Sequence, residues 1–369
     1  MLHLKSFPLK IILICTLNIT AGNLIDDTSI FKNLTKVHKG ESCGNSSTLS
    51  CSGAPPTPAD VLLYMTVAAV IFVTVCGNLL VIVSICHFKQ LHTPTNILLL
   101  SLAVADFLVG VTGMPFHFIS WLDPHWCLET IYCTLFNIAS FYMTCVSIYN
   151  VALIAVDRYF ALSNPFLYCT KMTVNLTLRM LYILWLSSLI YNVLFIYING
   201  NISEITGNVT CTECIVTANE FWTIFDFVIV FIVPCVTIII MYLNVFAIAR
   251  KHAHEINCVR KQNSSGTKMN NFSTGSERKA AKKLGILVAV FLLCLLPYYI
   301  NAFLSVYITT PSEYLTYMST VTLLYLNSSI NPIIYALFYP WFQKSVKLIL
   351  TFRICGSESS LLNVLLEEN

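Results

Sequence analysis

Seven apolar stretches follow one another along the chain, and each is long enough to cross a lipid bilayer as a helix. A hydrocarbon core about 30 Å thick needs around 20 apolar residues at the helical rise. We predict spans at 61–86, 96–121, 132–156, 181–198, 221–248, 284–307 and 314–338. The chain is therefore expected to be an all-α membrane protein, a bundle of seven transmembrane helices.

The composition excludes the other classes of fold. Apolar residues make up 56 % of the chain and charged residues 11 %, and the mean hydropathy is +0.73. Soluble proteins have roughly 45–50 % apolar and about 25 % charged residues. A soluble, disordered, coiled-coil or collagen-like chain is therefore excluded. The formal charge of +3 is too small to indicate a nucleic-acid partner.

The positions of the basic residues predict the orientation in the membrane. Of the 21 Lys and Arg residues, five precede the first span, and the other 16 fall in alternate loops, at the span ends facing those loops, or in the tail. The loops after the second, fourth and sixth spans contain none. Because cytoplasmic loops carry the excess of Lys and Arg, we expect an extracellular N-terminus and a cytoplasmic C-terminus.

Three regions follow from this topology. Residues 1–60 are the extracellular N-terminus, residues 61–338 the membrane domain with a long basic loop at about 251–283, and residues 339–369 the cytoplasmic tail. The tail begins with apolar residues opposed by lysines, which predicts a short amphipathic eighth helix on the inner leaflet. Residues 1–21 have lysines, a short apolar run and small residues, as in a signal peptide; the alternative is that they are retained.

Several residues on the predicted outer side are candidates for modification. Asn33, Asn45, Asn201 and Asn208 head glycosylation triplets, although four more triplets on the other side or within spans show how loose this motif is. Six cysteines also lie outside, in a compartment where disulfides persist, and six cysteines allow fifteen pairings. In the tail, Cys355 is either a palmitoylation site or a plain cysteine.

Only two carboxylates lie deep within the spans, Asp106 and Asp226. Buried ionisable groups are costly in a membrane and indicate a functional site. Polar residues also occur mid-span on other helices and could surround Asp106: Asn78, Ser147, Asn327, Ser328 and Asn331. This oxygen-rich lining predicts an allosteric sodium ion, the only cofactor we expect; the alternative is a hydrogen-bond network without an ion.

Asp226 has aromatic rather than hydroxyl neighbours along its own span. With no Lys or Arg at comparable depth, an organic ammonium would neutralise it, with aromatic faces adding cation–π attraction. The alternative is a neutral carboxyl hydrogen-bonded to a tyrosine. The candidate ligand-binding residues are Asp226, Ser140, Phe141, Thr144, Trp222, Phe227, Tyr298, Tyr299 and Tyr325. Tyr317 and Leu324 are further candidate walls.

Motifs along the spans resemble those of rhodopsin-like G-protein-coupled receptors. The motifs are Gly77-Asn78, Leu102 to Asp106, Asp157-Arg158-Tyr159, Trp185, Pro234, Pro297 and Asn331-Pro332-Ile333-Ile334-Tyr335. The resemblance covers about 61–355. A longer match, from Asn327 to Phe342, resembles the seventh-helix signature of the trace amine-associated receptors, N-S-x-x-N-P-x-x-Y-x-x-x-Y-x-W-F.

The resemblance implies a plasma-membrane receptor for trace or biogenic amine odorants, with a heterotrimeric G protein of the stimulatory or olfactory type, and arrestin, as partners. The residues it implies for activation and coupling are Asp157, Arg158, Tyr159, Glu277, Pro297, Asn331, Pro332 and Tyr335. It also implies disulfides from Cys133 to Cys214 and from Cys211 to Cys43 rather than Cys51, leaving a bridge between Cys51 and Cys127.

Two positions depart from the family pattern. The usual amine-anchoring Asp of the third helix, eighteen residues before Arg158, is replaced by Ser140, whereas Asp226 stands where a subgroup found among fish receptors has its carboxylate. Leu295 replaces the usual Trp of the sixth helix, so Phe291 or Tyr298 is expected to take over its packing; the alternative is an unusual mode of activation.

Two other functional classes compete with a receptor. An amine transporter would show internal repeats or broken, Gly-rich spans, and the sequence has neither. An enzyme would need paired catalytic groups, and Asp226 has no such neighbour in its span. A receptor for a non-amine ligand is a further alternative. We therefore expect a receptor and no enzymatic activity.

Overall fold

The computed structural model describes residues 58–122, 130–199, 218–262, 272–307 and 313–351, with single residues at 354, 360 and 364. All of them belong to one compact unit, Pro58–Asn369. The predicted signal peptide, the four predicted glycosylation sites and Cys355 lie outside the described residues.

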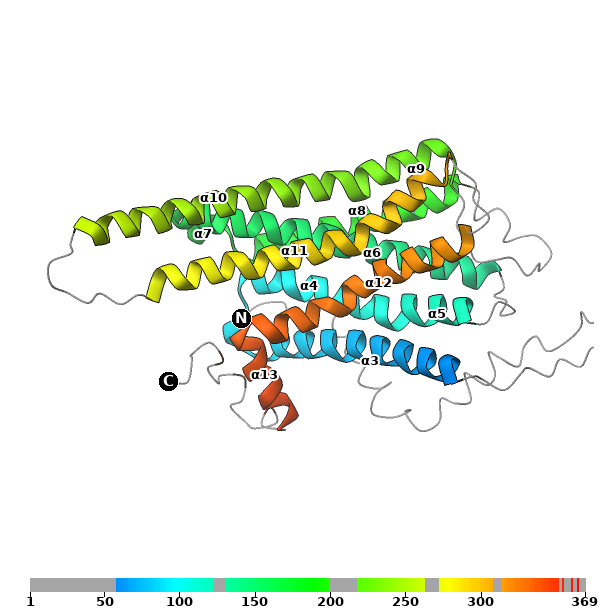
Figure 1. The fold of residues 1–369 in the computed structure, drawn as a ribbon, viewed down its shortest axis with the longest axis horizontal. Helices are drawn as coiled ribbons and strands as arrows, with labels where there is room; N and C mark the ends of the chain where they lie inside the picture. Colours follow the sequence, from blue (N-terminus) through cyan, green and yellow to red (C-terminus); the bar gives the residue numbers. More distant parts are fainter. Residues whose placement is uncertain are drawn as a thin grey trace, which may run out of the picture. The chain divides into compact units, whose positions relative to one another are not determined.

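Seven long helical segments run side by side in the described ranges (Figure 1). In chain order they are α3 (Pro58–His87); α4 (Pro94–Leu108) with η3 (Val109–Gly113) and α5 (Met114–Leu122); α6 (Thr130–Ser163); α8 (Val174–Ile198); α9 (Glu220–Asp226) with η5 (Phe227–Ile232) and α10 (Val233–Gln262); α11 (Phe272–Leu304); and α12 (Glu313–Phe338). Three short elements connect or follow them: η2 (Lys89–Leu91), α7 (Pro165–Lys171) and α13 (Pro340–Leu350). Each long segment corresponds to one predicted span, although α11 ends three residues before the predicted end at 307, and the described residues form no strand.

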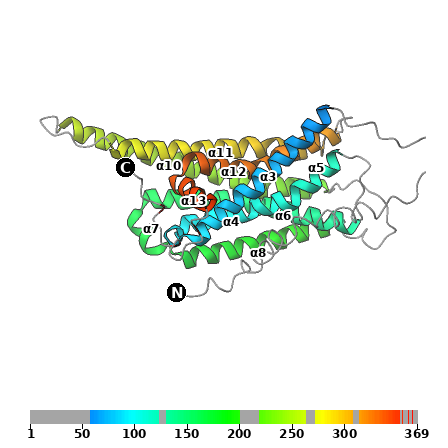
Figure 2. The same ribbon diagram turned by 90° about the horizontal axis from the view of Figure 1, so that it is seen from below.

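The helices extend well beyond the predicted spans at one end. Both α10 and α11 enter the predicted loop at about 251–283, since α10 ends at Gln262 and α11 begins at Phe272. Figure 2 shows the two helices lying together past the ends of the others. This segment is rich in Ala, Lys, Arg and Glu, which favour helix even where the chain is no longer apolar. The part of the predicted loop that the structure describes is therefore helical.

The helices differ in how far their apolar stretches extend. Within the described ranges, five segments are long and apolar enough to span a bilayer. A sixth, Leu315–Leu337 of α12, passes this test together with α13, which turns from it by 94°, and α11 has a shorter apolar stretch at Val288–Leu304. The turned helix α13 is the predicted amphipathic eighth helix; it buries Trp341 and Phe342 and leaves Lys347 exposed.

Local sequence explains where several helices begin. Thr93, Thr173 and Asn219 each accept a hydrogen bond from the backbone N–H three residues later, which caps α4, α8 and α9. Proline at the first position of α4, α7 and α13 removes a donor that would have had no partner in the helix.

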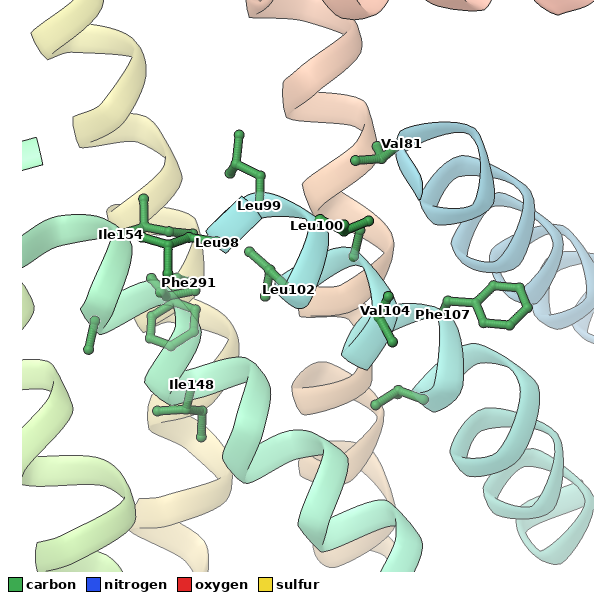
Figure 3. Close-up of a cluster of buried hydrophobic side chains, with 14 of the residues drawn as sticks. Val81, Leu98, Leu99, Leu100, Leu102, Val104, Phe107, Ile148, Ile154 and Phe291 are labelled. Atoms are coloured by element: carbon green, nitrogen blue, oxygen red, sulfur yellow. The ribbon is translucent and has the colours of Figure 1, made fainter. Parts of the chain in front are cut away.

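Buried apolar side chains from several helices form the core of the bundle. Figure 3 shows Leu98 of α4, Ile154 of α6 and Phe291 of α11 gathered between their helices. Each is at most 4 % exposed. This packing fixes the depth of α4 and α6, the helices that carry Asp106 and the residues facing it.

Two π-helical turns interrupt the long segments near the candidate sites. η3 follows the turn that carries Asp106, and η5 begins directly after Asp226. A wide turn leaves a backbone carbonyl without its usual helical partner, and the Tyr149 hydroxyl of α6 donates to the Ile229 carbonyl in η5 at 2.7 Å. This bond ties α6 to the segment that carries Asp226.

Candidate functional site

Asp106 is completely buried and accepts three side-chain hydrogen bonds. Ser147 and Ser328 donate to Oδ1 at 2.9 and 2.8 Å, and Asn331 donates to Oδ2 at 2.6 Å. Asn78 joins indirectly, by donating to the Ser328 carbonyl at 3.1 Å. The predicted polar cluster is therefore assembled from α3, α4, α6 and α12.

A small cavity lies beside this cluster. It has a volume of about 10 Å³, close to what one water molecule needs, and Ser147, Ser328, Asn327 and Leu295 are among its lining residues. The Asn78 Oδ1 atom is buried and has no hydrogen-bond partner among the described residues. Hydroxyl, amide and carboxylate oxygens thus stand close together, a donor set that suits a hard monovalent cation.

Leu295, which lines the same cavity, is 1 % exposed, so it fills the place that the family gives to Trp with a smaller side chain.

Asp226, the last residue of α9, has a different environment. The Tyr191 hydroxyl of α8 donates to its Oδ1 at 2.6 Å, and no other hydrogen bond to Asp226 occurs within the described ranges. The ion pair in the described ranges is the one between Arg158 and Asp157. Asp226 therefore has no cationic partner in those ranges. Tyr191 was not among the predicted site residues, because α8 gives little sign in sequence of which of its faces is buried.

Aromatic residues pack on one another along the segment that carries Asp226 and on the facing helix α11. Trp222 lies 5.4 Å from Phe225 between ring centroids, on the outer end of α9. Phe227 lies 5.2 Å from Phe303 of α11, and Tyr299 stacks on Phe231 at 4.6 Å. Tyr298 and Tyr299 of α11 are within electrostatic range of Asp226.

A second cavity, of about 40 Å³, lies between α5, α6, α11 and α12. Five of the predicted ligand-binding residues line it: Ser140, Phe141, Thr144, Tyr298 and Tyr325. Tyr317 and Leu324 line it as well. Asp226, Trp222, Phe227 and Tyr299 do not, so the predicted single site is divided. Tyr298 connects the two parts, because its ring lies 5.1 Å from that of Tyr299, which lies 6.5 Å from Phe227. Asp226 itself bonds to Tyr191 on α8.

His117 of α5 lines the cavity, although no sequence pattern singled it out. It is 5 % exposed, and its Nε2 lies 3.0 Å from the Thr322 hydroxyl. Because Thr322 donates its single hydrogen to the Met318 carbonyl, Nε2 carries the proton in this contact. Nδ1 of the neutral ring is then an acceptor. A lone histidine on an apolar face is usually a packing residue, and only the cavity distinguishes this one.

At the other end of the bundle Asp157 accepts hydrogen bonds from side chains on three helices, α4, α6 and α7. It is 2 % exposed and accepts from Thr95 at 2.8 Å, from Tyr168 at 2.6 Å and from Arg158 at 2.7 Å. Arg158 also donates to Thr95. Burial and the bond to Asp157 raise the pKa of Tyr168 above its usual value, so the phenol stays a donor at neutral pH.

The remaining residues predicted for activation and coupling lie on α6, α11 and α12. Pro297 and Pro332 lie inside α11 and α12, and Tyr335 is 1 % exposed beside Tyr339 and Phe342. Tyr159 packs on Phe160. Glu277 belongs to α11, but its side chain lies outside the described part, so its role in activation stays a prediction.

The disulfide predictions fall mostly outside the described residues. Cys133, near the start of α6, is disulfide-bonded. The other five cysteines of the predicted set, Cys43, Cys51, Cys127, Cys211 and Cys214, lie outside the described ranges. The pairing scheme therefore stays a prediction.

Comparison with known proteins gives one consistent family. Residues 77–335 match the family described as 7 transmembrane receptor (rhodopsin family). Trace amine-associated receptor 13c of Danio rerio is 39 % identical over 320 residues, which cover 85 % of this chain and 93 % of that receptor. Trace amine-associated receptor 7e of Mus musculus is 36 % identical over 344 residues, covering 92 % and 96 %.

The trace amine-associated receptor 7a of Rattus norvegicus is 37 % identical over 321 residues, which cover 85 % of this chain and 89 % of that receptor. The residues matched by the family, 77–335, include both Asp106 and Asp226. The chain belongs to the trace amine-associated receptors of the rhodopsin family, and it is a multi-pass plasma-membrane receptor with a small-molecule ligand and a G-protein partner, not an enzyme.

Proposed function

We propose that this receptor binds amines and that Asp226 anchors their ammonium group. The observation that carries the proposal is a half-buried carboxylate, among aromatic rings, whose one protein partner within the described ranges is the neutral Tyr191 hydroxyl. An ammonium 4 Å away would contribute about 4 kcal/mol at an effective dielectric near 20. The relatives are named as receptors for trace amines, which agrees with this chemistry.

The body of the ligand is proposed to lie toward the cavity between α5, α6, α11 and α12. Tyr298 lines that cavity and its ring lies 5.1 Å from that of Tyr299, which neighbours Phe227 next to Asp226, so Tyr298 is the wall between the two parts. Phe141 and Tyr325 supply aromatic surface on the far side. Each aromatic face turned toward a desolvated cation contributes about 0.5–2 kcal/mol.

Signalling is proposed to follow from a shift between two states of the bundle. An amine that binds better to one packing of the helices near Asp226 increases the population of that state. At the cytoplasmic end the Asp157–Arg158 pair would open and free Arg158 for a stimulatory or olfactory G protein, which raises cyclic AMP; arrestin would bind the same end. The amine would then be an odorant reaching the extracellular face.

The experiment is an amine panel tested by cyclic AMP in cells that express the wild type, Asp226→Ala or Asp226→Asn. We expect both variants to reach the cell surface and to lose their amine responses, since an isosteric amide keeps the shape and removes the charge. Glu220→Gln is the control, because it removes an exposed carboxylate from the same helix α9 and should keep the amine responses. Unchanged amine potency in Asp226→Asn would refute the anchor, and amine uptake without cyclic AMP would indicate a carrier.

We also propose that sodium binds beside Asp106. Support comes from the small cavity next to Ser147 and Ser328 and from the unpartnered Asn78 Oδ1 nearby. Replacing sodium with a large organic cation should raise basal cyclic AMP and agonist affinity in the wild type. In Asp106→Asn the same replacement should change neither, and an equal response in both would exclude this site.

A second candidate function is recognition of a neutral ligand in the cavity itself. The cavity lining includes no carboxylate within the described ranges, whereas His117 Nδ1 can accept a hydrogen bond there. In that case the ligand would carry an N–H or O–H group, and His117→Ala would abolish its response while Asp226→Asn would leave the response intact.

A further inference from the structure

The bond between Tyr191 and Asp226 has the features of a charge-assisted hydrogen bond. The distance of 2.6 Å lies in the range of about 2.5–2.7 Å for a hydroxyl that donates to a carboxylate. A carboxylate only accepts, so the phenol must supply the hydrogen. The Tyr191 oxygen therefore retains its lone pairs, and they stand next to the carboxylate.

The Tyr191 ring is held in this place by its neighbours. Its centroid lies 6.2 Å from Phe195 on the same helix and 6.4 Å from Phe225 on α9. The other polar groups nearby are engaged elsewhere: Tyr149 donates to the Ile229 carbonyl at 2.7 Å and Asn192 to the Ser188 carbonyl at 2.8 Å. Among these side chains Tyr191 is thus the one placed to act together with Asp226.

A ligand ammonium at Asp226 would therefore meet two oxygen acceptors. One is the carboxylate and the other is the phenol oxygen of Tyr191, which accepts while its own hydrogen stays on Oδ1. Primary and secondary ammonium groups have at least two N–H bonds and can donate to both oxygens. A tertiary ammonium has a single N–H and can donate to only one.

We propose that Tyr191 is a specificity-determining residue that, with Asp226, selects primary and secondary amines over tertiary amines. The inference rests on the proposed function of Asp226 as the anchor. It predicts a step down in potency from secondary to tertiary amines and little change from primary to secondary amines. The reason is that primary and secondary ammonium groups can both donate to two oxygens, whereas a tertiary ammonium can donate to only one.

The test uses one arylalkyl amine with its N-methyl and N,N-dimethyl derivatives, measured by cyclic AMP. In the wild type we expect the dimethyl derivative to be about tenfold less potent than the monomethyl one, the worth of one hydrogen bond to a charged group. In Tyr191→Phe this ratio should approach one, mainly through weaker responses to the primary and secondary amines. A ratio of potencies within one variant does not depend on its expression level.

Tyr197→Phe is the matched control, since Tyr197 is on the same helix α8 and its side chain is 65 % exposed. The step should persist there. A wild type without the step, or a step that survives in Tyr191→Phe, would overturn the inference. Asp226→Asn separates the two proposals: if it keeps amine responses the anchor itself is wrong, whereas loss there with an unchanged step in Tyr191→Phe refutes only the role of Tyr191.

Discussion

A single glycine sets how closely two of the helices approach each other. A Cβ atom built on Gly77 of α3 would lie 2.7 Å from the Pro332 Cβ of α12, closer than nonbonded carbon atoms pack. The Pro332 ring is part of its backbone and cannot swing away. Gly77 therefore determines the distance between α3 and α12, and with it the contact of Asn78 with Ser328 in the Asp106 cluster.

We predict that Gly77→Ala destabilises the receptor by forcing α12 away from α3. Overpacking of this kind costs about 1–3 kcal/mol. The expected result is a lower Tm of the detergent-solubilised receptor and reduced surface expression. Gly113→Ala is the control, because a Cβ there would meet the Tyr325 ring at 3.4 Å, an ordinary contact. Equal Tm values for the two variants would contradict the explanation.

Two single residues, Ser140 and Asp226, determine where the ligand-site carboxylate lies relative to the cavity. Ser140 lies on the cavity wall, is 4 % exposed and faces Tyr325, whereas Asp226 lies beside Tyr191 and outside the cavity lining. The negative charge in this receptor is thus separated from the cavity in which the usual third-helix anchor would lie.

We predict that Ser140→Asp adds responses to amines that dock from the third helix. The new carboxylate would enter the cavity lining directly, beside Phe141 and Tyr298. The measurement is the amine panel in cyclic AMP assays of the variant, with Ser140→Asn as the uncharged control of similar size. If no amine gains potency in the Asp variant, the shape of the cavity rather than its charge decides selectivity.

Among the elements, the short helix α7 links with α4 at the end of α6 that carries Asp157. Tyr168 of α7 and Thr95 of α4 both donate to Asp157 of α6, at 2.6 and 2.8 Å. Asp157 is therefore satisfied by two neutral donors as well as by Arg158. The family motif marks Asp157 and Arg158, but it gives no indication of the donors on α4 and α7.

We predict that Tyr168→Phe raises basal signalling. Loss of one hydrogen bond to a charged group costs about 1.5–3 kcal/mol, which weakens the packing that holds Asp157 and Arg158 together. Basal cyclic AMP should rise several-fold at equal surface expression, with agonist potency shifted to lower concentration. Thr170→Ala on the same helix removes only an exposed hydroxyl that bonds within α7, so it should behave as the wild type. A basal level that stays at the wild-type value in Tyr168→Phe would argue against this role.

At the scale of the whole molecule, the distribution of basic residues predicts how the bundle is oriented in the membrane. The five Lys residues before the first span are followed by three loops without Lys or Arg on the same predicted side. All other basic residues lie on the opposite side, where α10 and α11 extend past the remaining helices.

We predict an extracellular N-terminus and a cytoplasmic C-terminus, because the side with the excess of Lys and Arg stays in the cytoplasm. An epitope tag placed before residue 58 should bind antibody on intact cells, and a tag after Asn369 should bind only after permeabilisation. A labelling pattern the other way round would contradict the topology and place the amine site on the wrong side of the membrane.

The sequence alone determined the class of fold, the number of spans and the family, because these depend on the length and order of apolar stretches and on motifs local to one helix. It also selected Asp106 and Asp226, since a carboxylate within an apolar stretch is visible without knowledge of its neighbours. The partners of Asp106 could be named as a set, but not which of them donate to which oxygen.

Only the tertiary structure decided the contacts between helices. Tyr191, His117, Thr95 and Tyr168 became site residues through the rotation and depth of their helices, which result from packing such as that of Gly77 on Pro332. Almost every face of these helices is apolar, so hydrophobic periodicity gives no signal of which face turns inward. For the same reason the division between Asp226 and the cavity could be found only once the helices were assembled.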